Sequence, residues 1–520
     1  MRFVWAWAVG AIVMILLSIW LLAWVSFELF LYWQRVDIAF FPWDVFHYLD
    51  LIFNSQALVI CFVVTFGSVI SILAYTVLTK TILREKTFGD AHFAGPIEIA
   101  KSGLLEKEGI VLGKKYGATL KIPGFESVLV VGPTGAGKTR SIAIPNLMTW
   151  QGSGVYNDLK GELWRLTAEF RTKHLSQACY LFAPASGDIT THKYNPFFYV
   201  STYPKYQIRD LQLIAETLIP NERVDGGFWT TSSRDMFIML ALYLFEQEEL
   251  PTLAAIHDLS KREDFGEWLA FEVEKGEIQS EVFYQNANSL LGADAERTQK
   301  NIVKDFHSRM TLFVDPLVRE ATSGNDFDLS RLRKDKMNAY VHIPEGDQKR
   351  LQPILTLFWA QLTDLMTRKE PDLSDEPIPV LALMDEFGNM AKIPKLQAAM
   401  SFMRSYRIRC IVMVQYLGQI YSVYGQYDSK AFLNAKAKVV FALNDLDDAK
   451  YISNCLGNKT VKVHSRTINS GSEHSRGYMS HNASYQGQPL LNPGEIAQLN
   501  KNHCIVLMEG RAPVLLNKVR

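Results

Sequence analysis

The residues best suited to chemistry lie in one short stretch, Gly132-Pro-Thr-Gly-Ala-Gly-Lys-Thr139, directly after the apolar run 128–131. Glycines let the backbone fold so that successive N–H groups point at one anion, and the helix that follows turns its positive end toward the same place. In this pattern Lys138 reaches the β- and γ-phosphates of a nucleotide and Thr139 holds Mg²⁺. The predicted binding set for ATP and Mg²⁺ is Gly132, Pro133, Thr134, Gly135, Ala136, Gly137, Lys138 and Thr139.

Two adjacent acids, Asp385 and Glu386, end a second apolar run at 380–384. A strand that stops at two acids is common in turns, so this signal gains its strength from the phosphate loop. A buried central strand would place Asp385 beside the metal ion and Glu386 where it orients the attacking water. We therefore predict Thr139 and Asp385 as metal ligands, and Lys138, Asp385 and Glu386 as catalytic residues.

Two further polar residues, Arg404 and Gln415, flank a third apolar run. In recA-like sheets a polar residue in the position of Gln415 can contact the γ-phosphate. Arg404 is a candidate to reach the nucleotide of a neighbouring subunit as an arginine finger. The alternative for Arg404 is compensation of a helix dipole at a C-terminus, which contributes about 0.3 to 1 kcal/mol. The sequence leaves both interpretations of Arg404 open.

Asn157 and Asp158 follow the short apolar stretch 154–156, and Glu162 comes soon after. These residue types suit a helix N-cap with an acid in the first turn. They also suit a ligand site, because ligands bind at the carboxyl ends of strands in open α/β sheets. The sequence does not decide between the two.

The sequence pattern around these residues predicts an α/β domain that an all-helical segment interrupts. Strands are expected at 128–131, 154–156, 180–182, 338–343, 380–384 and 438–442, with a closing hairpin of 505–508 and 514–516 around Glu509-Gly510. Helical periodicity dominates 203–313 instead. The prediction is a recA-like nucleotide-binding domain in two parts, 81–200 and 316–520, with an all-alpha domain inserted at 201–315.

The N-terminus is expected to anchor the chain in a membrane. Residues 3–31 and 51–78 are apolar runs longer than the roughly 20 residues that cross a bilayer core. A short loop at 32–50 joins them, and basic residues precede the first span and follow the second. The positive-inside rule therefore places both ends in the cytoplasm, with 1–80 as the anchor.

Composition excludes several classes of protein. The chain has 520 residues, with 54 basic and 54 acidic side chains. It therefore has no overall excess of basic residues that would indicate nucleic-acid binding. Its five cysteines form no C-x-x-C pair, which argues against a zinc site or a disulfide framework. The polar segment 465–488 carries arginine and tyrosine. It suits either a surface loop or a contact with single-stranded nucleic acid.

The whole pattern resembles a family, the type IV coupling proteins of conjugation and type IV secretion (TraG-type). The resemblance covers nearly the whole chain in order. It is carried by the two N-terminal spans, Gly132–Thr139, Asn157-Asp-Leu-Lys-Gly-Glu162, Tyr194-Asn-Pro196, Phe228-Trp229 with Arg234, Leu383-Met-Asp-Glu-Phe387, Gln415 and Pro489-Leu-Leu-Asn-Pro493.

The resemblance implies a homo-hexameric ring in the bacterial inner membrane. In it, ATP hydrolysis would drive single-stranded DNA with its attached relaxase toward the subunits of a type IV secretion channel. It also implies that Arg404 is the finger acting in trans and Gln415 the γ-phosphate sensor. One departure is the lack of the long acidic tail that some members use for partners. Alternatives are a motor for effector proteins only, a nucleotide-gated membrane scaffold and a chromosomal double-strand translocase.

Overall fold

The computed structural model describes residues 87–221, 227–247, 250–292, 296–468 and 479–519, together with Trp24 and Gly67. The predicted membrane spans at 3–31 and 51–78 lie outside the described residues except for those two, and the loop at 32–50 lies wholly outside them. Among the helices in the described ranges, none is long and apolar enough to cross a bilayer. The chain divides into two units, Met1–Phe88 with Lys462–Tyr485 and Gly89–Val461 with Gln486–Arg520.

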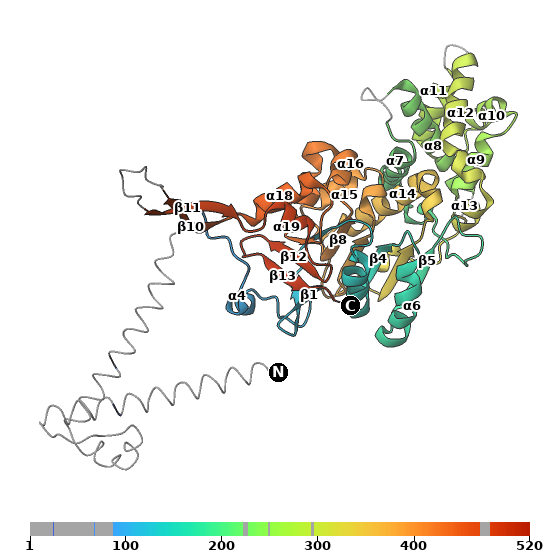
Figure 1. The fold of residues 1–520 in the computed structure, drawn as a ribbon. Coiled ribbons are helices and arrows are strands. Elements are labelled where there is room, and N and C mark those ends of the chain that lie inside the picture. Colours follow the sequence, from blue (N-terminus) through green and yellow to red (C-terminus); the bar gives the residue numbers. More distant parts are fainter. Residues whose placement is uncertain are drawn as a thin grey trace, which may run out of the picture. The chain divides into compact units, whose positions relative to one another are not determined.

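The larger unit is built on an eleven-stranded sheet in the order β2-β1-β13-β12-β9-β3-β8-β7-β4-β6-β5 (Figure 1). Seven neighbouring strands are parallel: β9 (Ala437–Val440), β3 (Val128–Val131), β8 (Ile408–Val414), β7 (Val380–Met384), β4 (Ser153–Asn157), β6 (Met337–Val341) and β5 (Ala178–Phe182). Strands β3, β7 and β8 are buried at every position, as the uninterrupted apolar runs of a parallel sheet require. The predicted α/β class is confirmed.

Four antiparallel strands extend the sheet beyond β9. They are β12 (His503–Met508), β13 (Val514–Asn517), β1 (Ile110–Lys115) and β2 (Ala118–Ile122). The hairpin predicted around Glu509-Gly510 is the β12–β13 pair. Because β12 opposes β9 and β13 opposes β12, β13 runs in the same direction as the parallel strands. Its carboxyl end therefore lies on the same edge of the sheet as theirs.

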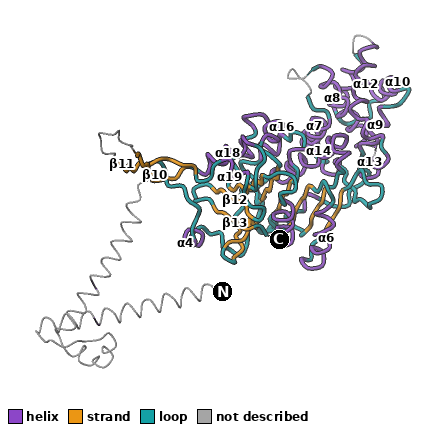
Figure 2. Tube along the Cα trace, viewed as in Figure 1, coloured by secondary structure: helices purple, strands orange, loops and turns teal. Residues whose placement is uncertain are grey.

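Helices cover both faces of the sheet, as Figure 2 shows with strands in orange between purple helices. Side chains alternate across a strand, so neighbouring residues of β3 serve different cores. Val130 packs with the helices α5 (Ile144–Thr149) and α6 (Glu162–Leu175). Leu129 belongs to the core shared with α14 (Gln348–Thr367). The remaining helices near the sheet are α4 (Pro96–Lys101), α15 (Pro394–Ala399), α16 (Gly418–Asp428), α17 (Lys430–Leu433), α18 (Leu446–Leu456) and α19 (Pro493–Ala497).

Between β5 and β6 the regular elements in the described residues are all helices. They are η3 (Pro196–Tyr199), α7 (Pro204–Leu218), α8 (Phe228–Gln247), α9 (Leu253–Ser260), α10 (Phe265–Lys275), α11 (Glu281–Leu291), α12 (Glu296–Met310), η4 (Thr311–Val314), α13 (Pro316–Ala321) and η5 (Leu329–Arg331). Figure 1 shows α8 to α13 gathered beyond β5 and α14. α9 and α10 are separate helices, because Lys261-Arg-Glu-Asp264 between them offers no apolar residue to continue the buried stripe.

One sequence interpretation is wrong in part. The segment 465–488, read as a loop, largely belongs to two paired strands, β10 (Asn458–Ile468) and β11 (Met479–Pro489). β-Branched residues, which favour extended backbone, precede the segment at Thr460, Val461 and Val463, and within its described part they occur at Thr467 and Ile468. The polar composition concealed this strand signal. Residues 469–478 lie outside the described part of the chain.

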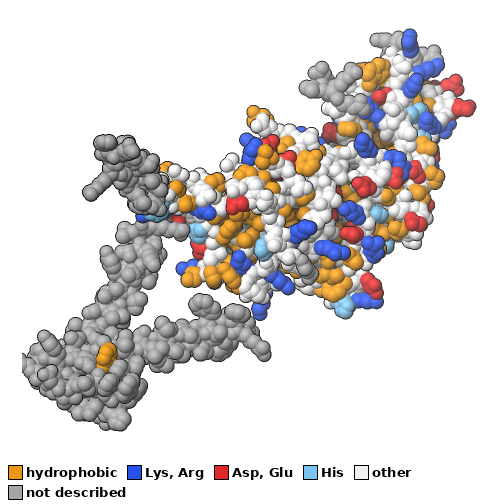
Figure 3. Space-filling model, in the orientation of Figure 1, with side chains coloured by type: hydrophobic (Ala, Val, Ile, Leu, Met, Phe, Trp, Pro, Cys, Tyr) orange, Lys and Arg blue, Asp and Glu red, His pale blue; other side chains and the backbone are white. Residues whose placement is uncertain are grey.

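Charged side chains of both signs are interspersed over the face that Figure 3 shows. This surface agrees with equal numbers of acidic and basic residues in the chain. A strong electrostatic attraction for nucleic acid would need one sign to dominate a surface. Any DNA contact on this face therefore depends on local groups.

Candidate nucleotide site

The phosphate loop joins β3 to the short π-helical turn η2 (Thr139–Ala143), which leads into α5. Gly135 and Gly137 adopt φ values of 77° and 86°, which L side chains rarely adopt. A Cβ atom at Gly132 would lie only 2.8 Å from the Cβ of Phe441, which is too close for two carbon atoms. Glycine at these positions is thus a geometric requirement, and the loop forms the cradle that the sequence predicts.

Lys138 folds back over this cradle. Its Nζ donates to Gly132 O at 2.7 Å and lies 3.4 Å from Pro133 O. The side chain is buried, and desolvation lowers the pKa of the ammonium, while the charges of Glu386 and Asp385 act in the opposite direction. The cation therefore lies beside the loop that would bind an anion, held by two carbonyls that a phosphate can replace.

Thr139 and Asp385, the two predicted metal ligands, are in direct contact. The hydroxyl Oγ1 of Thr139 donates to Asp385 Oδ2 at 3.1 Å. Burial, followed by the charge of Glu386, raises the pKa of Asp385 to about 6. A hydroxyl and a carboxylate are hard oxygen ligands of the kind that Mg²⁺ prefers beside a nucleotide's phosphates. The residues present therefore fit a magnesium ion.

Glu386 and Gln415 form the next contact along the same edge. Gln415 Nε2 donates to Glu386 Oε2 at 2.8 Å, and the backbone N–H of Gln415 donates to Gln419 Oε1 at 2.8 Å. Glu386 has left-handed backbone, with φ 52° and ψ 41°. A non-glycine residue there costs about 1–2 kcal/mol, a strain often found at functional sites. Gln415 reaches Glu386 because β8 lies between β3 and β7.

Asn157 and Asp158, which the sequence left undecided, have separate roles. Asn157 Nδ2 donates to the backbone carbonyl of Asp385 at 2.8 Å and so ties β4 to the end of β7. Asp158 accepts from the N–H of Trp164 at 2.7 Å, in the first turn of α6. Asp158 therefore satisfies a backbone N–H in the first turn of α6, whose N-cap residue is Gly161, whereas Asn157 positions the acid that faces Thr139.

Arg404 lies apart from these residues. It follows α15 in a turn, five residues after the helix ends, so it does not compensate a helix terminus as one sequence interpretation proposed. Its Nη1 donates to Glu126 Oε1 at 2.8 Å, and 67% of the side chain is exposed. It precedes β8, while Gln415 follows it. A seven-residue strand spans roughly 20 Å, so Arg404 and Gln415 occupy opposite edges of the sheet.

Lys518 is a residue at this site that the sequence interpretation missed. It follows β13, and its Nζ donates to the carbonyl of Ala136 at 2.8 Å. The same ammonium lies 4.3 Å from the centroid of the Phe441 ring. No local motif marks it, because its position depends on the order of strands far apart in the chain.

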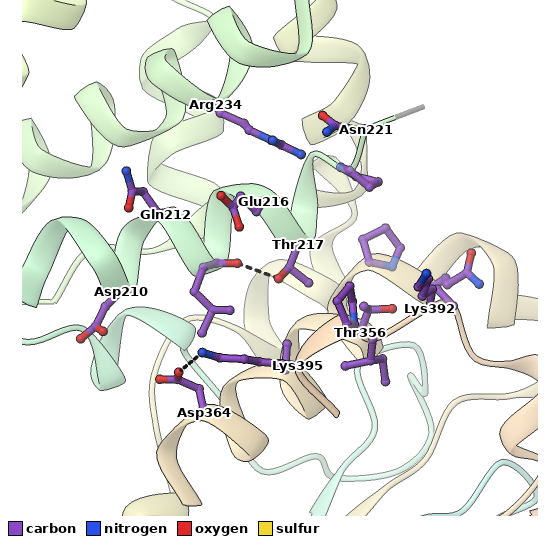
Figure 4. Close-up of a pocket in the computed structure, with 18 of the residues that line it drawn as sticks. Asp210, Gln212, Glu216, Thr217, Asn221, Arg234, Thr356, Asp364, Lys392 and Lys395 are labelled. Carbon is purple, nitrogen blue, oxygen red and sulfur yellow. Dashed lines mark hydrogen bonds and ion pairs between the residues drawn. The ribbon is translucent and has the colours of Figure 1, made fainter. Parts of the chain in front are cut away.

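A cavity of about 770 Å³ lies elsewhere in this unit, lined by α7, α14 and the segment 391–395 (Figure 4). Lys395 and Asp364 form an ion pair on its wall, 2.9 Å between Nζ and Oδ1. Its lining includes none of the residues that the sequence predicts to bind a nucleotide. It offers no glycine cradle for a phosphate, so we assign the nucleotide to the loop at Gly132–Thr139.

Comparison with known proteins relates this chain to proteins of conjugative DNA transfer. A family model described as type IV secretory system conjugative DNA transfer matches residues 93–520. The protein VirD4 of Rhizobium radiobacter is 30% identical over 482 residues, which cover 87% of this chain and 67% of that protein. A conjugal transfer protein TraG of Escherichia coli is 26% identical over 401 residues, which cover 73% of this chain and 63% of TraG.

The fold also has a solved counterpart. The plasmid coupling protein TrwB, in complex with a non-hydrolysable ATP analogue, superposes with a TM-score of 0.61 at 17% identity. The alignment covers 84% of this chain and 94% of the TrwB chain. The family match begins before β1 and includes the phosphate loop, both acids and Gln415. The chain therefore belongs to the family of type IV secretory system proteins of conjugative DNA transfer.

Proposed function

We propose that this chain is a membrane-anchored P-loop ATPase that couples DNA to a type IV secretion channel. The observation that carries the proposal is the continuous set of contacts at the carboxyl edge of the sheet. Thr139 meets Asp385 there, and Glu386 meets Gln415. Phosphate cradle, metal ligands and a polar partner for the base thus occupy adjacent strand ends, as ATP hydrolysis requires.

Each residue has a distinct role in this proposal. The loop N–H groups and Lys138 bind the β- and γ-phosphates of ATP, and Thr139 with Asp385 holds Mg²⁺. When bound, the ion neutralises charge on the transferring phosphoryl group. Glu386 orients the attacking water and takes up its proton. Gln415 aligns the carboxylate of Glu386 through their hydrogen bond and contacts the γ-phosphate.

Membership of the family supports a proposal for the larger assembly. Residues 1–80 anchor the chain in the inner membrane with both termini in the cytoplasm. Residues 81–200 and 316–520 form the motor, and 201–315 form an all-alpha domain that faces cargo. A homo-hexamer moves single-stranded DNA with its relaxase toward the other channel subunits. Arg404 then acts on the nucleotide of a neighbouring subunit, because it is exposed and far from its own phosphate loop.

The test is ATP turnover by the purified full chain, measured with and without single-stranded DNA. Turnover should rise with DNA in the wild-type protein, and Lys138→Ala should abolish it by removing the phosphate-binding cation. Lys173→Ala is a matched control, since Lys173 is an exposed lysine of α6 that pairs with Glu169. It should behave as the wild type does.

The outcomes separate the alternatives. If the ATPase activity does not change with DNA but rises with a secreted protein, the cargo is protein and not DNA. Nucleotide binding without turnover under any condition would leave a nucleotide-gated scaffold. Turnover that survives in Lys138→Ala would overturn the assignment of the site itself.

A further inference from the structure

The last described strand of the chain delivers a lysine to the phosphate loop. Lys518 Nζ donates to Ala136 O at 2.8 Å, within the predicted nucleotide-binding set. The backbone N–H of Lys518 donates to Asn502 O at 2.8 Å, which fixes the point where the side chain leaves the sheet. The contact joins residues 382 positions apart in sequence.

Strand direction explains why a lysine from this distant strand arrives at this edge. β13 runs in the same direction as β9 and β3, since two successive antiparallel pairings separate it from β9. Lys518 comes directly after β13, and Phe441 comes directly after β9. Phe441 in turn lies against Gly132 and donates its backbone N–H to Val131 O at 2.9 Å. The three strand ends thus pack in sequence around the loop.

The ammonium lies over the ring of Phe441, 4.3 Å from its centroid. Such a contact is attractive because the face of an aromatic ring is electron-rich. It holds the side chain of Lys518 in one direction, toward Ala136. Lys518 is therefore fixed at both its charged end and its backbone.

This contact orients a peptide of the cradle. In a trans peptide the C=O and the N–H of the next residue point in opposite directions. With the carbonyl of Ala136 turned to Lys518, the N–H of Gly137 points away from Lys518. A charge bonded to the carbonyl also polarises the amide and makes its N–H a stronger donor to an anion.

We propose that Lys518 is a positioning residue for nucleotide binding. It holds the Ala136–Gly137 peptide in the orientation that presents the Gly137 N–H to a phosphate, and it links the β12–β13 hairpin to the occupancy of the loop. The inference deepens the proposed function and depends on that assignment of the site.

The experiment compares two lysines of the same antiparallel extension in the full chain. Lys518→Met removes the cation and keeps an unbranched side chain against Phe441. The matched control is Lys115→Met, because Lys115 Nζ also donates to a backbone carbonyl, Leu515 O at 2.7 Å, and lies 5.3 Å from a ring centroid, that of Tyr116. Lys115 makes no contact with the phosphate loop in the described residues.

The measurements are the dissociation constant of Mg·ADP by calorimetry, KM and kcat for ATP, and the melting temperature without nucleotide. Lys518→Met should weaken Mg·ADP about tenfold and raise KM for ATP by a similar factor, with kcat changed less. Lys115→Met should leave the dissociation constant of Mg·ADP and KM for ATP near their wild-type values. It should shift the melting temperature by about as much as Lys518→Met does. Lys518→Arg should restore most of the affinity, since it keeps the cation and the donors.

Equal affinities in the Lys518→Met and Lys115→Met variants would overturn the inference. If the methionine variant does not fold, Lys518→Gln takes its place in the same comparison. Because ADP binding alone decides the result, a wild-type chain that binds ADP but hydrolyses no ATP would overturn the proposed function and leave this comparison decisive. A wild-type chain that does not bind ADP would overturn both.

Discussion

At the carboxyl edge of the parallel strands Lys138, Asp385 and Glu386 are each less than a tenth exposed, whereas Arg404 at the amino edge exposes 67% of its side chain. Lys138 and Asp385 form hydrogen bonds with the loop, and Glu386 accepts one from Gln415. Arg404 forms an ion pair with Glu126 instead. Burying charges is costly, so a folded chain retains such a group only where its members compensate one another.

This difference separates two kinds of proposed functional residue on one sheet. The carboxyl edge carries residues that need a fixed mutual geometry before substrate arrives. The amino edge offers an arginine that an exposed ion pair holds with about 0–1 kcal/mol. That weak contact leaves Arg404 available for a stronger one. In a ring of identical subunits, we propose, the amino edge of one subunit completes the carboxyl edge of the next.

Beyond Lys138→Ala, which should abolish turnover, the largest effect should come from Arg404→Ala. In its proposed role as a finger acting in trans, Arg404 would stabilise charge in the transition state, so its loss should lower kcat by roughly 10³- to 10⁵-fold with little change in ATP affinity. The melting temperature should stay near wild type because the pair with Glu126 is exposed. Glu126→Ala is the control, and it should keep most of the turnover. A normal kcat in Arg404→Ala would leave the amino edge without a catalytic role.

Glu386→Gln probes the other edge. Replacing the carboxylate by an amide removes the base but keeps a side chain that can bond to Gln415. Turnover should fall by about 10²- to 10⁴-fold, and Mg·ATP should still bind. Rapid-quench measurement of one turnover would separate chemistry from product release. A loss of ATP binding as large as the loss of turnover would show that Glu386 supports the loop instead of the attacking water.

Asn157→Ala tests how the buried edge is held in place. The substitution removes the donor to Asp385 O and leaves that buried carbonyl without it, which should lower the free energy of unfolding by about 1–3 kcal/mol. It should also weaken Mg²⁺ binding, so that turnover needs a higher Mg²⁺ concentration, because Asp385 loses the hydrogen bond that supports it. Asp158→Asn, which keeps an acceptor for Trp164, should affect stability less and Mg²⁺ dependence not at all. Equal Mg²⁺ titrations in both variants would contradict this assignment.

The smallest effect should be a pH dependence from Asp448. Burial raises the pKa of Asp448 to about 6, and its Oδ2 accepts from the N–H of Leu417 at 2.7 Å. A carboxyl whose pKa is higher in the folded state stabilises the fold when protonated. That contribution, about 1–3 kcal/mol, is present below the ordinary carboxyl pKa and is lost as the pH rises from about 4 through about 6.

Asp448→Asn keeps the acceptor for Leu417 and removes the charge. Its melting temperature at pH 7 should therefore exceed that of the wild type by a few degrees, and the two should converge near pH 4. Denaturation followed by circular dichroism at several pH values measures this. A variant less stable than the wild type at pH 7 would contradict burial of the charge as the cause of the raised pKa.

Local sequence patterns predicted the parts of the site that depend on contiguous residues. Gly132–Thr139 folds as a cradle because its glycines supply positive φ values at fixed positions. Asp385 and Glu386 could be anticipated because an apolar run of 380–384 ends at them. The hairpin around Glu509-Gly510 was also predicted correctly, from two apolar runs separated by a turn.

Other features depend on strand order, which no local pattern carries. Lys518 reaches Ala136 because β13 is separated from β9 by one antiparallel strand, a fact settled by pairings between distant residues. Asn157 and Asp158 looked equivalent in sequence, yet one side chain points to Asp385 and the other to the start of α6. The surroundings of Arg404 likewise required knowledge of Glu126, which lies 278 residues away.

The most direct test of the shared site mixes two inactive proteins. Glu386→Gln and Arg404→Ala chains are co-purified as mixed assemblies, and ATP turnover with single-stranded DNA is compared with each variant alone. In the mixture some interfaces pair an intact Glu386 with an intact Arg404 from the neighbour, so turnover should reappear at a fraction of the wild-type rate. A mixture no more active than its parents, while wild-type chains mixed with either variant remain active, would contradict a site shared between subunits.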